Sequence, residues 1–160
     1  MTDINKLNLL GQSKHLYPEE YNPNILESFE KLSTNKMQWV SFLCTEFTAL
    51  CPKTSQPDFA RIYLNYIPNK KMVESKSLKI YLYSFRNKGS FHESCVQTIC
   101  DDLVKLLEPH YLEVIGEFTP RGGISIFPFS SYSDKKHKKI YEERLYNYSP
   151  GKYSLALNRI

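Results

Sequence analysis

The run FHESCVQTICDDLVKLL, residues 91–107, carries the strongest periodic pattern in the chain. Its apolar residues recur at intervals of three and four: Val96, Ile99, Cys100, Leu103, Leu106 and Leu107. This spacing predicts an amphipathic helix with one face against a core. Pro109 then ends the helix, because proline cannot continue the backbone hydrogen bonding.

Further elements are predicted on both sides of this helix. A second helix is expected over residues 77–86, where Leu78, Leu82 and Phe85 have helical spacing. Strands are expected over residues 38–47, 59–67, 111–118 and 124–129, which are rich in β-branched and aromatic residues. The order β-β-α-α-β-β predicts an α+β fold, in which an antiparallel sheet carries two helices on one face.

Two regions outside this pattern are polar. Residues 1–36 are interpreted as an N-terminal extension, with one helix over residues 24–32, and residues 37–160 as a single domain. The basic run from Asp134 to Lys139 is typical of a solvated loop.

Composition limits the function classes. The chain has 160 residues, enough for one domain, and 21 Lys and Arg against 17 Asp and Glu give a net charge of +4. This excess is too small to indicate nucleic-acid binding. No apolar run is long enough to span a membrane, and the N-terminus lacks signal-peptide features, so we expect a cytoplasmic protein without membrane partners.

The cysteine pattern gives no metal motif. Cys44, Cys51, Cys95 and Cys100 include no C-x-x-C pair, and His92 is the nearest histidine, three residues before Cys95. We therefore expect no metal ion, and the simplest interpretation of all four is a small buried hydrophobe.

Cys51 and Asp58 have two interpretations. Cys51 follows an apolar strand, and Asp58 comes seven residues later. They form either a nucleophile with a nearby proton donor, or a buried thiol with an ordinary turn aspartate. Spacing alone favours the second interpretation.

Other polar residues could bind a ligand. Glu93 could accept two parallel hydrogen bonds from a guanine-like edge, and His92 could donate or relay a proton. Lys76 and Lys79 near a helix start, and Arg121 beside two glycines, could bind phosphate. Ordinary solvated charges explain these residues equally simply.

Several segments, taken together and in order, resemble one known family. They are FTALCPKT (47–54), QPDFA (56–60), VESKSLK (73–79), SFRN (84–87), FHE (91–93) and FTPRGGI (118–124). They resemble the QueF nitrile reductases of queuosine biosynthesis from about residue 42 to residue 128. The resemblance implies the tunnelling fold and a homo-oligomeric ring, expected as a homodecamer of two stacked pentamers.

The resemblance also implies an activity. NADPH would reduce the nitrile of 7-cyano-7-deazaguanine (preQ0) to the aminomethyl group of preQ1. Cys51 would form a covalent thioimide with the nitrile carbon, and Asp58 would donate the proton. The remaining roles are implied for eight residues, substrate binding for Val73, Glu74, Ser75, His92 and Glu93, and NADPH phosphate binding for Lys76, Lys79 and Arg121.

Three other functions stay open. They are hydrolysis of the nitrile, a GTP cyclohydrolase-like reaction on a purine or pterin with zinc, and a non-catalytic purine-binding ring. One further hypothesis comes from spacing: if His92 lines the pocket of Cys51, then Cys95, one helical turn later, could form a protective disulfide with Cys51.

Overall fold

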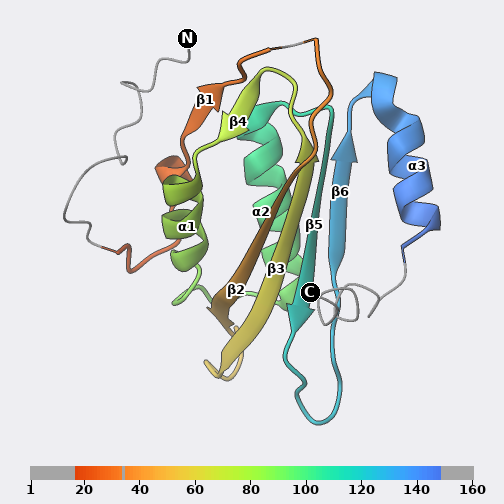
Figure 1. The fold of residues 1–160 in the computed structure, drawn as a ribbon. Coiled ribbons are helices and arrows are strands. Elements are labelled where there is room, and N and C mark those ends of the chain that lie inside the picture. Colours follow the sequence, from red (N-terminus) through yellow and green to blue (C-terminus); the bar gives the residue numbers. More distant parts are fainter. Residues whose placement is uncertain (1–16, 34, 149–160) are drawn as a thin grey trace.

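The computed structural model describes residues 17–33 and 35–148. Its main sheet is antiparallel and four-stranded, and two helices cover one face of it (Figure 1). The strands in spatial order are β2 (Val40–Leu50), β3 (Pro57–Ile67), β5 (Tyr111–Phe118) and β6 (Phe129–Ser133). The helices are α1 (Ser75–Tyr83) and α2 (His92–Leu107). The expected α+β fold and its β-β-α-α-β-β order are confirmed.

The core lies between the sheet and these helices. On β3, Ile62, Leu64 and Tyr66 alternate toward the core and are almost fully buried, as the period of a strand requires. The apolar stripe of α2 packs against them. Gly116 on β5 permits this close packing, since a Cβ there would lie 2.8 Å from Cγ2 of Val96.

The prediction of a helix over residues 24–32 is wrong. A 3-10 turn, η2 (Pro23–Ile25), is followed by a short strand, β1 (Ser28–Glu30). Strand β1 pairs with β4 (Lys71–Val73), which the sequence reasoning missed. A partner more than 40 residues away decides this conformation, so local propensity could not indicate it. The division between an extension over 1–36 and a domain over 37–160 stays a prediction.

The last expected strand lies further along the chain. Strand β6 begins at Phe129, whereas residues 124–128 only continue the pairing through single bonds such as Gly116 N–H to the Pro128 carbonyl, 2.9 Å. Pro128 has no N–H to donate, which interrupts the ladder at this point.

The basic run is more ordered than the expected loop. A 3-10 turn, η3 (Lys135–His137), leads into a third helix, α3 (Lys138–Tyr146). Its lysines are exposed, as expected, and two of them pair with glutamates one turn later, Lys138 with Glu142 at 3.3 Å and Lys139 with Glu143 at 3.8 Å. Such pairs favour helix over loop. Among the described residues, no helix is long and apolar enough to cross a membrane.

Candidate functional site

A cavity of about 390 Å³ lies where β2 ends, β3 begins and α2 starts. Its volume is in the range of small-molecule sites. Four candidate residues and Arg121 share it. The lining residues are Cys51, Pro52, Asp58, Ser90, Phe91, His92, Glu93, Arg121, Ile124 and Ile126.

Backbone hydrogen bonds bring Cys51 to the start of α2. Leu50, the last residue of β2, donates its N–H to the Lys88 carbonyl at 3.0 Å and accepts from the Ser90 N–H at 2.9 Å. Gly89 lies between these two and close to the turn after Cys51, since a Cβ at Gly89 would stand 3.4 Å from the Cα of Pro52. The turn with Cys51 is therefore fixed beside the helix that carries His92 and Glu93.

The thiol of Cys51 is activated by its own turn. Hydrogen bonds from the Thr54 hydroxyl and from the backbone N–H groups of Lys53 and Thr54 lower the pKa of Cys51 to about 7, and Arg121 adds to this effect. A substantial fraction of Cys51 is therefore thiolate at neutral pH, the form that acts as a nucleophile.

Asp58 is the first core-facing residue of β3 rather than a turn residue, and only 4% of its surface is exposed. Its Oδ2 lies 3.2 Å from Nε2 of His92, whose ring stacks on Phe118 with a centroid distance of 4.1 Å. Its Oδ1 lies 3.1 Å from Nη1 of Arg121. That contact is not aligned as a hydrogen bond, so within the described residues Oδ1 has no hydrogen-bond partner. A buried carboxylate oxygen with unused accepting capacity is thus present beside the cavity.

Arg121 reaches Asp58 from a tight turn. Gly122 and Gly123 have positive φ angles of 57° and 81°, which side chains rarely adopt, and backbone bonds join Arg121 and Ile124 in both directions. The guanidinium also donates to the side chain of Gln56. Sequence reasoning missed both its ion pair with Asp58 and the role of Thr54. The second had a usable signal, since a hydroxyl three residues after a turn cysteine can reach back to it.

The other five candidates lie elsewhere. In the described part of the chain, the lining of the Cys51 cavity does not include Val73, Glu74, Ser75, Lys76 or Lys79. Glu74 instead caps α1, because its carboxylate accepts from the N–H of Lys76 at 2.8 Å and of Ser77 at 2.7 Å.

A second cavity of about 520 Å³ contains two of these residues, Ser75 and Lys79. Arg86 and the rings of Tyr17 and Tyr83 also line it. Two cations beside two aromatic rings suit a ligand that has both phosphate groups and a flat base.

The remaining cysteines differ from Cys51. Cys95 and Cys100 are buried, as expected, whereas Cys44 and Cys51 are partly exposed. Burial raises the pKa of Cys44, Cys95 and Cys100, the last to about 11. Asp58 is among the charges that act on Cys95, which places this thiol near the site. The Cys51–Cys95 disulfide stays a prediction.

The fold and the cavity define the class, a tunnelling-fold protein with a pocket built around an activated cysteine. The fold is shared with the archaeosine synthase QueF-Like in the apo form (TM-score 0.55, 15% identity, 64% of this chain and 98% of that chain). A family model described as QueF-like protein matches residues 57–137. The chain belongs to this QueF-like family.

Two relatives match most of the chain. One from Bdellovibrio bacteriovorus is 61% identical over 153 residues, which cover 94% of this chain and 90% of the relative. One from Staphylococcus saprophyticus is 53% identical over 148 residues, which cover 91% and 89%. Both are named NADPH-dependent 7-cyano-7-deazaguanine reductase.

Proposed function

We propose that this chain is an NADPH-dependent reductase that converts the nitrile of preQ0 into the aminomethyl group of preQ1, in the cytoplasm. The names of the relatives support the reaction. The observation that carries the mechanism is that the low-pKa thiol of Cys51 and the buried carboxylate of Asp58 meet in one cavity. Addition to the carbon of a nitrile requires a strong nucleophile. The nitrile nitrogen must gain a proton as the carbon–nitrogen triple bond becomes a double bond.

Cys51 starts the reaction as a thiolate. Its sulfur adds to the nitrile carbon, and Asp58 gives a proton to the nitrogen, which produces a thioimide. NADPH, bound twice in succession, supplies two hydrides. After the first hydride, the C–S bond breaks and releases the thiolate of Cys51, which leaves an imine inside the cavity. The second hydride, with protons returned through Asp58, gives the amine.

His92 and Arg121 position Asp58 by contacts to its two different oxygens. They hold the carboxylate beside the thiol and leave Oδ1 able to accept or carry the proton. His92 and Glu93 would also contact the base, with Glu93 bound to its guanine-like edge. A site that hydrogen-bonds such an edge discriminates against analogues that lack it by about 10⁴-fold or more.

Lys76, Lys79 and Arg121 are proposed to bind the phosphates of NADPH. Lys79 fits this role best, because it shares its cavity with Arg86 and two tyrosine rings. Arg121 already pairs with Asp58, but about a third of its side chain is exposed, and this part would bind the phosphate.

A ring of copies would complete the site. Val73, Glu74 and Ser75 would contact the substrate from a neighbouring protomer. Strand β2, eleven residues long, forms one edge of the sheet, and Leu43 on it is 44% exposed. Long exposed edges favour pairing with another chain. We expect a homodecamer of two stacked pentamers, which the molar mass in solution tests.

The decisive experiment mixes the purified protein with preQ0 and NADPH and follows NADPH absorbance and product mass. We expect about two NADPH consumed per preQ0 and no turnover by Cys51→Ala. Conversion of preQ0 to an amide without NADPH consumption would indicate a hydrolase instead. Turnover by Cys51→Ala at the wild-type rate would refute the covalent mechanism.

The predicted disulfide has its own test. Peptides from protein treated with a mild oxidant should include a Cys51–Cys95 linkage that a reducing agent reverses. The Cys95→Ser variant should turn over normally in reducing buffer, but should lose activity irreversibly after oxidation. Oxidised wild-type protein without this linkage would contradict the hypothesis.

A further inference from the structure

Two histidines and an aspartate meet far from the Cys51 cavity. His110 immediately precedes β5, Asp134 follows β6 as the N-cap of η3, and His137 is the last residue of η3. Figure 1 shows that β5 and β6 lie side by side and that α3 follows β6. The His110 N–H donates to the carbonyl of Ile67, the last residue of β3, whereas Asp58 is the second residue of that strand. The cluster and the cavity are thus separated by the length of β3, about 30 Å.

The three side chains converge on one point. Nδ1 of His110 lies 2.8 Å from Oδ2 of Asp134, and Nδ1 of His137 lies 2.7 Å from Oδ1. The two imidazole centroids are 4.3 Å apart. One ligand atom from each of the three residues lies within 4.8 Å of the others. Two imidazole nitrogens and a carboxylate therefore lie close enough together for one ion to contact all three.

We propose that His110, Asp134 and His137 bind a divalent transition metal of the zinc type. Imidazole and carboxylate are the ligands that such ions prefer, and three protein ligands with one water complete a tetrahedral site. Bonds of 2.0–2.2 Å place neighbouring donors about 3.3 Å apart. The two nitrogen–oxygen contacts, 2.8 and 2.7 Å long, would need to widen by about half an ångström to admit the ion.

The backbone around the cluster is already fixed. The Asp134 N–H donates to the His110 carbonyl at 3.0 Å, and the His137 N–H donates to the Asp134 carboxylate at 2.9 Å. The side chains keep exposed fractions of 31%, 29% and 20%, which leaves a route for the ion and its water. A preformed backbone reduces the ordering that metal binding requires.

Nearby charge does not exclude a cation. Four lysines flank the cluster in sequence, but Lys138 and Lys139 pair with Glu142 and Glu143. A metal at this position would connect the start of β5 to the start of α3. Its role would be to fasten α3 to the sheet, not to take part in the reduction.

The test uses untagged full-length Cys51→Ser protein, so that the reactive thiol cannot capture the ion. Calorimetric titration with Zn²⁺ should show one equivalent bound, and the melting temperature should rise by about 5 °C or more. Co²⁺ should give visible bands of a site with nitrogen and oxygen ligands. Millimolar Mg²⁺ should not displace Zn²⁺.

Asp134→Asn in the same background should weaken Zn²⁺ binding by at least about 100-fold, since it removes a direct ligand. Asp101→Asn, at an exposed aspartate of α2, is the matched control and should bind normally. Circular dichroism checks that both variants fold. No Zn²⁺ binding, displacement by Mg²⁺, or unchanged binding in folded Asp134→Asn would each overturn the proposal; the first would leave a trio held by hydrogen bonds alone.

Discussion

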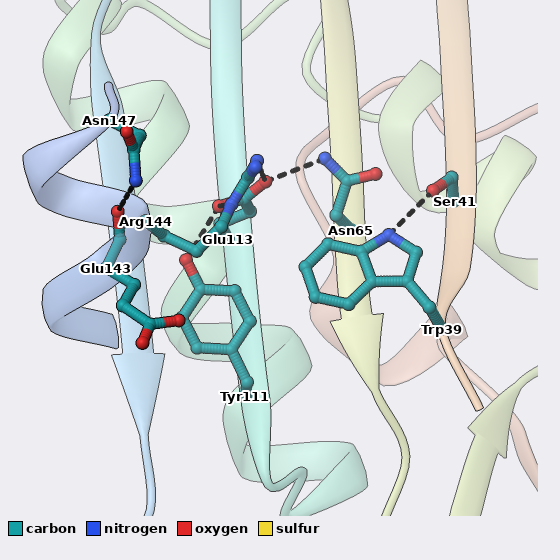
Figure 2. A network of polar contacts seen from close by, with 8 residues as sticks. All are labelled: Trp39, Ser41, Asn65, Tyr111, Glu113, Glu143, Arg144 and Asn147. Carbon is teal, nitrogen blue, oxygen red and sulfur yellow. Dashed lines mark hydrogen bonds and ion pairs between the residues drawn. The ribbon is translucent and has the colours of Figure 1, made fainter. Parts of the chain in front are cut away.

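Asp58 on β3 and Glu113 on β5 are two carboxylates removed from solvent on neighbouring strands, and their surroundings differ. Glu113 is fully buried and saturated (Figure 2). Its Oε1 accepts from Asn65 and Arg144, and its Oε2 accepts from the Tyr111 hydroxyl at 2.6 Å and from Nε of Arg144 at 3.0 Å. Arg144 reaches it from α3, so this carboxylate fastens a helix to the sheet.

Asp58 is held more loosely. His92 and Arg121 approach it, but Oδ1 has no hydrogen-bond partner among the described residues, and the side chain borders a cavity. A saturated carboxylate stabilises a structure, whereas one with spare capacity beside a cavity can exchange a proton with a ligand. The difference teaches that burial alone does not make a carboxylate a candidate acid; unused hydrogen-bonding capacity beside a cavity is the distinguishing feature.

The sharpest test replaces each acid by its amide. Asp58→Asn should reduce NADPH consumption by about 10²–10⁴-fold, because the amide cannot donate the proton. Glu113→Gln should leave the rate per folded protein within a few-fold of wild type. Steady-state rates with saturating preQ0 measure both, and a large loss in Glu113→Gln alone would reverse the assignment.

Removal of Arg144, the cation that pairs with Glu113, should strongly lower the free energy of unfolding. Arg144→Met leaves the buried charge of Glu113 without its ion pair, so the free energy of unfolding should fall by about 3–5 kcal/mol. Urea unfolding measures this loss, and the melting temperature provides a second measurement of it. Lys139→Met is the matched control, since its pair with Glu143 is exposed and contributes about 1 kcal/mol or less. Equal losses in the two variants would contradict the comparison.

Glu113→Gln should have a smaller effect on stability than Arg144→Met. The amide keeps the shape and part of the hydrogen bonding, and the partly exposed Arg144 can turn to water. We expect a loss of about 1–3 kcal/mol in the free energy of unfolding. A loss larger than that of Arg144→Met would mean that Glu113, not the cation, limits the attachment of α3.

Sequence reasoning succeeded where the pattern is local. The stripe from Val96 to Leu107 and the alternation on β3 predicted the helix, the strand and the buried faces that the structure has. It failed where the partner is distant. Glu113 looks like an ordinary solvent-facing residue until Arg144, 31 residues later, is placed over it.

The contrast between local patterns and distant partners also holds within the candidate site. The family resemblance, not residue spacing, grouped Cys51, Asp58, His92 and Glu93, and in the structure all four line one cavity. The pairing of Arg121 with Asp58 joins the turn after β5 to the start of β3, and only the register of β3 with β5 brings the two together. The spacing of residues along the sequence does not predict that register.

The smallest expected effect concerns the hydrogen bonds that lower the pKa of Cys51. Thr54→Val removes the main hydrogen bond that lowers the pKa of Cys51 to about 7, so the pKa should rise toward its ordinary value. Because the thiolate reacts and the thiol does not, alkylation by iodoacetamide increases with pH, and its midpoint should move from about 7 to a higher pH. At pH 7 the rate should fall about five- to tenfold, whereas at pH 10 the two proteins should react alike. Thr45→Val, at an exposed threonine of β2, is the control and should keep the wild-type midpoint. An unchanged midpoint in Thr54→Val would mean that the Thr54 hydroxyl is not needed, and that the backbone N–H groups of Lys53 and Thr54, with Arg121, are enough to activate Cys51.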